Sequence, residues 1–331
     1  MIPLFTAGQV NQAVSPERAV EAVREAFVAY ARGKWTMPPK VYVPAYPAGD
    51  FRAMPALGAG HALLKWVTSF PGNPAKGLPT VTGLVLLSSA EDGRLVAVLD
   101  AAAVTALRTG AAAVLAAETL GRANSETAAV VGAGVNGQAA ARTFLALGRT
   151  VSLYDVDRER AEAAAATLGA GVAGSLEEAL AADLVVTMTP GHEILLSEGT
   201  LRPGQHVSLM GADGPGKAEI AVAELARCRL FCDDWEQAGS NGISEPSVRL
   251  FVDDWEQASH GGETAAAVEA GLLGREDVTE LGAVLTGDAP GRQNADDVTL
   301  FDSTGLAIQD LAIALVALER AEELDLPMLD F

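Results

Sequence analysis

The chain has 331 residues, with 23 Lys and Arg against 43 Asp and Glu, so its formal charge at pH 7 is −20. So few cations exclude the large basic face that binds nucleic acid or an anionic membrane surface. Apolar residues make up 49% of the chain and charged residues 20%, as in folded globular proteins, and the length predicts two domains.

The cysteine and histidine content bears on location and on metal binding. Cys228 and Cys232 are the only cysteines, and no His lies beside them, so we expect neither a disulfide framework nor a zinc site. The four histidines are scattered without the spacing of metal ligands: His61, His192, His206 and His260. The N-terminus resembles no signal peptide, and Arg108 and Asp310 interrupt the two longest apolar stretches, so we expect a cytoplasmic protein without a membrane span.

The pattern of apolar and polar residues changes twice in the first third of the chain. Ser15, Pro16 and Glu17 form a helix start, with a capping residue, a proline and an acid in order. Residues 41–100 form short apolar runs split by Gly and Pro, which predict a mostly antiparallel or mixed sheet. Residues 101–120 are rich in Ala and predict a helix.

From residue 125 strand patterns alternate with helical patterns, which predicts βαβ units and a parallel sheet. The alternation includes a short strand near Gly171 and a helix from Ser175. A helical pattern returns after residue 300, and we expect this last helix to pack against the N-terminal part. The fold class is therefore α/β, with a Rossmann domain at 121–304 inserted in an α+β domain formed by 1–120 and 305–331.

A tandem repeat lies inside the second domain. Residues 229–238 read RLFCDDWEQA and residues 249–258 read RLFVDDWEQA, a match at nine of ten positions. Two copies are too few for a repeat architecture, so a local duplication is the simplest interpretation. We expect one copy to form a strand of the sheet and the other to form a surface excursion or an extra edge strand, and the sequence leaves open which copy does which.

The strongest local motif is the G-x-G-x-x-G at residues 132–138, which follows an apolar strand and opens an Ala-rich helix. Gly132 permits the tight turn, Gly134 lets a pyrophosphate approach the backbone, and Gly137 lets helix and strand pack closely. Asp155 follows at the end of the next strand, where a carboxylate binds a ribose 2′-hydroxyl. The motif predicts a dinucleotide site that favours NAD over NADP, with Arg158 able to weaken that preference. A ligand-free turn is the alternative.

Charged residues elsewhere form a dispersed set of candidates. Arg108 is suited to clamp a carboxylate with two parallel hydrogen bonds. Asp213 follows a predicted strand of the parallel sheet, at the edge where ligands of such sheets bind. Lys65 lies in an apolar strand. Each of these residues, and Lys217, also has a plain structural interpretation as a surface residue or a helix cap.

Taken together, these motifs resemble those of the ornithine cyclodeaminase/μ-crystallin family, which includes archaeal-type alanine dehydrogenases and ketimine reductases. The resemblance covers nearly the whole chain and rests on these segments: MPPK (37–40), RAMPAL (52–57), LLKWVTSFPGNP (63–74), GLPTVTGLVLL (77–87), ALRTGAAA (106–113), GAGVNGQ (132–138), MGADGPGKAE (210–219) and FDSTGLAIQDLAIA (301–314).

The resemblance implies a homodimer whose active site lies between the two domains, with roles for specific residues. It implies that Lys65 and Asp213 are catalytic, with Asp213 moving the proton. The implied substrate-binding residues are Lys40, Arg52, Met54, Lys65 and Arg108. The implied cofactor-binding residues are Thr109, Gly132, Ala133, Gly134, Val135, Asn136, Gly137, Gln138, Asp155, Arg158, Thr189, Met210, Gly211, Ser303 and Thr304.

The resemblance also implies the chemistry, a hydride exchange between NAD(H) and the α-carbon of a small amino acid or imino acid. Cyclodeaminases of the family carry a Glu shortly before the Met-Pro to hold the distal ammonium of ornithine, whereas this chain has only Asp50 there. We therefore expect an alanine dehydrogenase or ketimine reductase rather than an ornithine cyclodeaminase. A non-catalytic NAD(P)H-binding protein of the crystallin type is the third reading, and the Lys65, Arg108 and Asp213 set argues against it.

Overall fold

A computed structural model describes residues 1–212, 216–230 and 248–330. The chain divides into two compact units, Met1–Ala111 with Leu306–Phe331, and Ala112–Gly305. The division falls inside helix α3 (Ala101–Leu120) rather than after residue 120. Among the described residues, α3 alone is long and apolar enough to cross a membrane, but 83% of its apolar window is buried within the protein, as in a core helix.

The first unit is built on a seven-stranded mixed sheet with the strand order β15-β1-β6-β5-β4-β3-β2. Its strands are β1 (Ile2–Phe5), β2 (Val41–Ala45), β3 (Gly49–Gly58), β4 (His61–Ser69), β5 (Val81–Ser89), β6 (Leu95–Asp100) and β15 (Met328–Leu329). Its helices are α1 (Ala7–Ala13), α2 (Pro16–Ala31), the first half of α3 and α11 (Ala307–Glu319), with short 3-10 turns at Pro74–Lys76 and Ala321–Glu323. Strands β2 to β6 run antiparallel, as predicted, and β1 adds to β6 in parallel.

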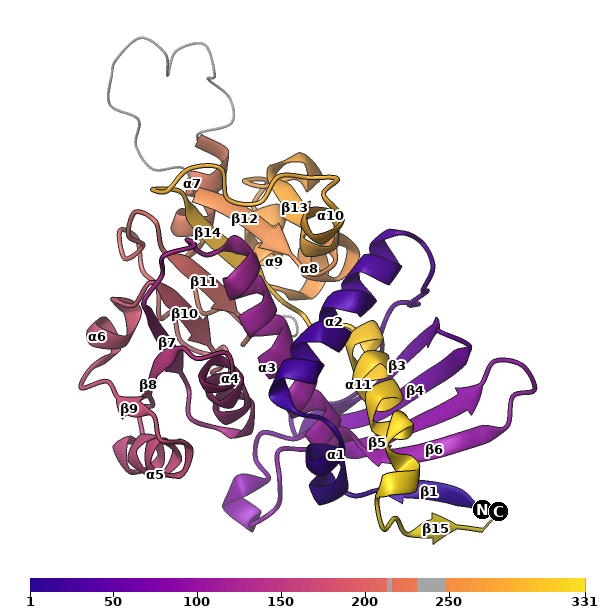
Figure 1. The fold of residues 1–331 in the computed structure, drawn as a ribbon. Helices are drawn as coiled ribbons and strands as arrows, with labels where there is room; N and C mark the ends of the chain where they lie inside the picture. The colour runs from indigo at the N-terminus through magenta and orange to yellow at the C-terminus, as the bar shows by residue number, and fades with distance from the viewer. Residues whose placement is uncertain (213–215, 231–247, 331) are drawn as a thin grey trace. The chain divides into compact units, whose positions relative to one another are not determined.

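Helix α11 lies against one face of this sheet, and α2 packs beside it (Figure 1). α2 begins as the sequence predicts, because the Ser15 side chain accepts a hydrogen bond from the backbone N–H of Arg18 and Pro16 occupies the first turn. α11 is buried along most of its length and packs on α2, β3 and β4. The last helix therefore returns to the N-terminal part of the chain, as expected, and brings Asp310 to the strands that carry Arg52 and Lys65.

The second unit is a Rossmann-type sheet of eight parallel strands in the order β13-β12-β14-β11-β10-β7-β8-β9. Its strands are β7 (Thr127–Val131), β8 (Thr150–Tyr154), β9 (Gly171–Val172), β10 (Leu184–Thr187), β11 (His206–Leu209), β12 (Val248–Val252), β13 (Val278–Glu280) and β14 (Val298–Asp302). Its helices are the second half of α3, α4 (Val135–Ala146), α5 (Arg158–Leu168), α6 (Leu176–Leu180), α7 (Val222–Leu230), α8 (Trp255–Gly261), α9 (Thr264–Glu269) and α10 (Leu281–Thr286), with a 3-10 turn at Arg275–Asp277. The predicted strand near Gly171 and the helix capped by Ser175 are both present.

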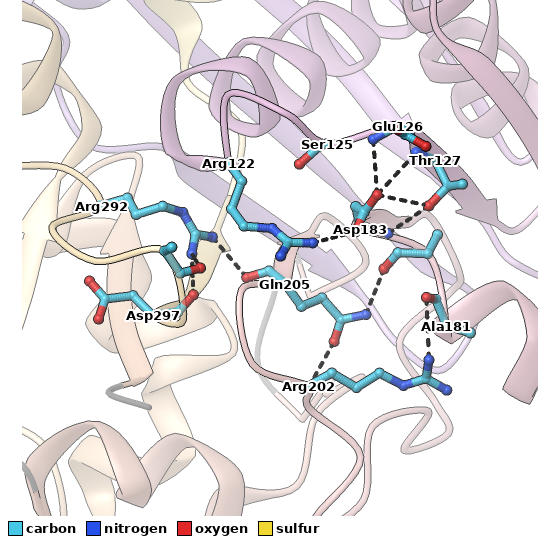
Figure 2. Close-up of polar contacts among 12 residues, drawn as sticks. Arg122, Ser125, Glu126, Thr127, Ala181, Asp183, Arg202, Gln205, Arg292 and Asp297 are labelled. Carbon is cyan, nitrogen blue, oxygen red and sulfur yellow. Dashed lines mark hydrogen bonds and ion pairs between the residues drawn. The ribbon is translucent and has the colours of Figure 1, made fainter. Parts of the chain in front are cut away.

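Hydrogen bonds from polar side chains connect the amino ends of neighbouring parallel strands (Figure 2). Asp183, directly before β10, accepts hydrogen bonds from Arg122 (2.6 Å) and from the backbone N–H of Thr127 (3.2 Å) at the start of β7. Arg292 donates to the carbonyl oxygen of Gln205 (3.0 Å) before β11 and to the Thr299 hydroxyl (2.9 Å) in β14. These contacts hold four neighbouring strands at the edge opposite to the one where ligands of parallel sheets bind.

The second copy of the repeat forms part of the sheet. Residues 248–252 are β12, which pairs in parallel with β13 on one side and β14 on the other. Asp254 caps the following helix α8 by accepting a hydrogen bond from the backbone N–H of Gln257 (3.0 Å). Most of the first copy, residues 231–238, lies outside the described residues, so the expected surface or edge placement of that copy is not described.

Candidate functional site

The dinucleotide motif has the geometry that a pyrophosphate requires. Gly132 has φ +105°, and a Cβ on Gly137 would overlap the carbonyl oxygen of Gly132, so both positions need glycine. Gly134 is the N-cap of α4, and a Cβ added there would meet no atom within 4 Å. The first turn of the helix is thus open for an anion to approach, and the neighbouring Val135 is 71% exposed. These residues fit the pyrophosphate of NAD.

Asp155 is held in place at the end of β8. Its carboxylate accepts hydrogen bonds from the backbone N–H of Ala133 (2.8 Å) and of Asp157 (2.9 Å). The cation beside it is Arg160, whose Nη1 lies 3.3 Å from Asp155 Oδ1. Arg158, which the sequence analysis assigned to the cofactor, is exposed and pairs with Glu162 one helical turn on (2.8 Å). Asp155 is therefore oriented by the glycine loop itself.

A buried glutamate organises the loops that follow β10 and β11. Glu219 accepts hydrogen bonds from the hydroxyls of Thr187 and Thr189 (both 2.5 Å) and from the backbone N–H of Thr189 and Gly211 (both 2.9 Å). Burial raises the pKa of Glu219, and these four hydrogen bonds oppose the rise. Thr189 and Gly211, both expected to bind the cofactor, are thus fixed by one side chain, and Met210 between the strand and Gly211 is buried.

Two further acids lie buried behind Glu219. Glu263 accepts hydrogen bonds from the backbone N–H of Glu219 (2.8 Å), and Asp302 accepts from the backbone N–H of Thr264 (3.0 Å). Burial, together with the charges of Asp302 and Glu219, raises the pKa of Glu263 to about 9. Burial raises the pKa of Asp302 to about 7. At neutral pH the carboxyl group of Glu263 is therefore protonated, and that of Asp302 is protonated in part.

A cluster of cations and acids lies inside the first unit. Lys65 Nζ lies 2.6 Å from Asp310 Oδ2, and Arg108 Nε lies 3.5 Å from the other oxygen of the same carboxylate. Lys65 and Asp310 are almost completely buried, and Arg108 is 9% exposed. Arg108 also donates to the side-chain oxygen of Gln309 (3.3 Å), and Lys65 to the Thr105 hydroxyl (3.4 Å). Helices α3 and α11 and strand β4 thus converge on one carboxylate.

Arg52 stands on the same face of the sheet as Lys65. Met54, two residues further along the same strand, pairs directly with Lys65 on β4 and is buried. Arg52 donates to both oxygens of Asp50 (2.6 and 3.3 Å), and its guanidinium lies over the ring of Tyr42, 5.3 Å from the centroid. Asp50 is therefore engaged with a cation.

The cluster controls the protonation of Lys65. Burial lowers the pKa of Lys65 to about 8, the nearby Asp310 carboxylate opposes this fall, and the charges of Arg108 and Arg52 add to it. An ammonium with such a pKa is suited to hold or release a proton near neutral pH. Three cations and two carboxylates leave one net positive charge, which suits a substrate with a single carboxylate.

The other predicted site residues have mixed positions. Thr109 is buried in α3, and its hydroxyl has no hydrogen-bond partner among the described residues. Ser303 and Thr304 directly follow β14 and are buried against Asp253. Lys40 and Lys217 are half-buried. Asp213, the predicted proton carrier, lies outside the described residues.

The histidine of strand β11 belongs to a buried hydrogen-bond network of the parallel sheet. His206 is completely buried, and its ring nitrogens contact the hydroxyls of Thr299 and Ser208 (both 2.9 Å). Burial lowers its pKa to about 3, so the ring is neutral. The part of the chain that the structure describes holds no group of three or more His, Cys, Asp and Glu that could bind a metal ion.

Five acids of these sites were given no role by sequence reasoning: Glu219, Asp253, Glu263, Asp302 and Asp310. Asp310 carried one signal, because it interrupts an otherwise apolar helix pattern, where a lone acid must find a cation. Asp253 and Glu219 lie in stretches without an apolar period, and only the fold shows what they bind.

Comparison with known proteins identifies the family of the chain. Residues 4–325 match the model of the ornithine cyclodeaminase/mu-crystallin family. The chain is 41% identical to an alanine dehydrogenase of Archaeoglobus fulgidus over 326 residues, which cover 96% of this chain and 94% of that protein. An archaeal alanine dehydrogenase dimer with bound NAD superposes with a TM-score of 0.86 at 40% identity, covering 97% of this chain and 96% of that one. The Δ1-pyrroline-2-carboxylate reductase of Thermococcus litoralis, in complex with NADH and L-proline, superposes with a TM-score of 0.85 at 25% identity, covering 97% and 98%. The chain belongs to the ornithine cyclodeaminase/mu-crystallin family.

Proposed function

We propose that the protein is an NAD(H)-dependent oxidoreductase that acts on the α-carbon of a small amino acid or its imine, of the alanine dehydrogenase or ketimine reductase type. The main support for this proposal is the buried cation cluster of Arg52, Lys65 and Arg108. In a chain that also holds a dinucleotide loop, such a cluster is suited to bind a substrate carboxylate next to the reacting carbon. The relatives named above act on alanine or bind proline, which supports this substrate class.

In this proposal the side chains of the chain bind, orient and move protons. Arg52 and Arg108 hold the substrate carboxylate, and their own acids fix their orientation. Lys65 donates to the oxygen or nitrogen on the α-carbon and stabilises charge there, and Asp213 carries the proton to and from the nitrogen or a water molecule. Bound NAD would supply the acceptor and the donor of the hydride that the α-carbon exchanges. Water then attacks the substrate imine in a dehydrogenase, giving an oxo acid and ammonia.

The cyclodeaminase reading has less support. A cyclodeaminase needs an acid for the distal ammonium of ornithine, and Asp50 is the only acid near the Met-Pro of this chain. Asp50 is 6% exposed and binds Arg52 through both oxygens. Removing it from Arg52 to hold a substrate would cost the buried guanidinium both of its hydrogen bonds to this carboxylate.

A substrate panel tests the proposal. NADH absorbance is followed with ammonia and pyruvate, with cyclic imines such as pyrroline-2-carboxylate, and separately NAD is incubated with ornithine. We expect NADH oxidation with an oxo acid plus ammonia or with an imine. Proline formed from ornithine without net change in NADH would identify a cyclodeaminase instead, and NADH binding without any turnover would identify a binding protein of the crystallin type.

We further propose that the protein is a cytoplasmic homodimer. One face of the first unit's sheet exposes Leu64, Trp66 and Leu84, and Trp66 lies directly opposite Leu84 on the neighbouring strand. An exposed apolar face of this kind favours burial against a partner, and the similar archaeal alanine dehydrogenase is a dimer. Light scattering tests this: we expect a dimer for the wild type and a monomer for Leu84→Glu, and a monomeric wild type would refute it.

A further inference from the structure

Asp253, the first acid of the second repeat copy, binds the turn that follows β14. Its carboxylate accepts hydrogen bonds from the backbone N–H of Thr304 (2.7 Å) and Gly305 (2.8 Å) and from the Ser303 hydroxyl (3.0 Å). The side chain is 3% exposed. A carboxylate that accepts three hydrogen bonds from one turn fixes the path of that turn, because losing it would leave buried N–H groups without partners.

The turn is also fixed from its other side, at a place where the cofactor is expected. The backbone N–H of Ser303 donates to the carbonyl oxygen of Leu209 at the end of β11 (3.1 Å). Strands β11, β14 and β12 are parallel neighbours, so their carboxyl ends meet at one edge. In a Rossmann sheet the dinucleotide lies across this edge, with the adenosine half near the glycine loop and the nicotinamide half beyond the switch point, over strands such as β10 and β11.

We propose that Asp253, which the second copy of the repeat supplies, is a positioning residue for the nicotinamide half of the bound cofactor. The proposal rests on the proposed function in its use of NAD(H). Asp253 acts through Ser303 and Thr304, which line the carboxyl edge. Val252, just before it, is completely buried in the strand between β13 and β14, where the first copy has Cys232.

The repeat provides a matched control within the same chain. Asp233 has the same neighbours in sequence as Asp253, since both are followed by Asp-Trp-Glu-Gln-Ala. Asp253→Asn and Asp233→Asn therefore make the same chemical change in the same local sequence. A difference in ligand affinity between the two variants would show which copy holds the turn after β14.

Calorimetric titration of the full-length protein with NADH and, separately, with ADP-ribose tests the proposal. We expect Asp253→Asn to weaken NADH binding about tenfold, the size of a lost charge-assisted hydrogen bond, and to leave ADP-ribose binding within about twofold. Asp233→Asn should bind both ligands as the wild type does. Equal loss of both ligands, no loss of NADH, or a loss in Asp233→Asn would each overturn the proposal.

A second variant covers the case in which Asp253→Asn does not fold. Ser303→Ala removes one donor to the same carboxylate and leaves the two backbone donors, so we expect a smaller loss for NADH alone. An unchanged NADH affinity in a folded Ser303→Ala would contradict the proposal. If the wild type itself bound no NADH, the proposed function would fail, whereas wild-type binding with insensitive variants would refute only the role of Asp253.

Discussion

Lys65 and Asp310 form an ion pair of 2.6 Å in the interior of the first unit, although one lies on a sheet strand near the N-terminus and the other on the last helix. The same carboxylate lies 3.5 Å from Arg108. Asp310 therefore links two of the three cations that we assign to substrate binding, and its charge opposes the fall that burial causes in the pKa of Lys65.

Replacing Asp310 by Asn should move the pH dependence of the reductive reaction. Lys65 must be protonated to bind an anion, so activity should fall as the pH rises through its pKa of about 8. Loss of the carboxylate lowers that pKa, so the falling limb of kcat/KM should move to lower pH. At pH 8 we expect a loss of about tenfold or more. Asp50→Asn is the comparison, because its partner Arg52 keeps its charge at every pH used; a limb that moves equally in both variants would contradict the assignment to Lys65.

Asp155 should determine the choice between NADH and NADPH. Its carboxylate is placed to accept from a ribose 2′-hydroxyl and to repel a 2′-phosphate. Asp155→Ser should weaken NADH binding about tenfold and improve NADPH binding, helped by Arg160 beside it. Fluorescence titration measures both affinities. As a control, Glu159→Gln removes an exposed charge in the same turn of α5 as Arg160 and should change neither affinity. If Asp155→Ser kept the wild-type preference for NADH over NADPH, residues other than Asp155 would bind the ribose.

Deletion of residues 231–250 should give a folded protein that binds NADH. The deletion removes one period of the repeat and joins Leu230 to Phe251, which restores the sequence RLFVDDWEQA. The deletion also removes the first residues of β12, but Arg229 and Leu230 from the end of α7 would take the places of Arg249 and Leu250, and every residue from Phe251 onward, including the cap of α8, is retained. Circular dichroism and thermal melting measure the fold. A deletion variant that cannot fold would mean that the first copy contributes to the core.

The buried acids behind Glu219 should make the protein less stable as the pH rises. The pKa of Glu263 is raised to about 9 and that of Asp302 to about 7, both far above their values in an unfolded chain. The folded state therefore binds more protons than the unfolded state between about pH 5 and 8, so stability is highest at the acid end of this window. The melting temperature should fall by several degrees across it, and less in Glu263→Gln. A melting temperature that rises across the window in the wild type would contradict this ionisation scheme.

Much of the fold could be predicted because its signals are local. The helix start at Ser15, the glycine loop at 132–138 and the alternation of strands and helices each depend on neighbouring residues. The repeat marks the limit of such reasoning. Its two copies have almost the same sequence and therefore almost the same local preference for a strand. Pairing with β13 and β14 is what identifies the second copy as the one that forms β12.

The site was predictable in its cations and less so in its acids. Lys65 and Arg108 lie in motifs, but their shared partner Asp310 reaches them only because α11 packs on β3 and β4. Arg158 and Arg160 lie on the same turn of α5, and the direction of each side chain, toward Glu162 or toward Asp155, depends on the helix geometry. Contacts between residues distant in the chain follow from tertiary packing, which no local pattern encodes.

The central claim is that a hydride moves between the nicotinamide and the α-carbon of a substrate bound by Lys65, Arg52 and Arg108. Its most direct test uses NADH that carries deuterium at both hydrogen positions of C4, with pyruvate and ammonia or a cyclic imine, followed by mass spectrometry of the product. We predict an amino acid that carries one deuterium at the α-carbon, formed in step with NADH oxidation and greatly reduced in Lys65→Met. A product without deuterium, or no product from any of these substrates, would contradict the claim.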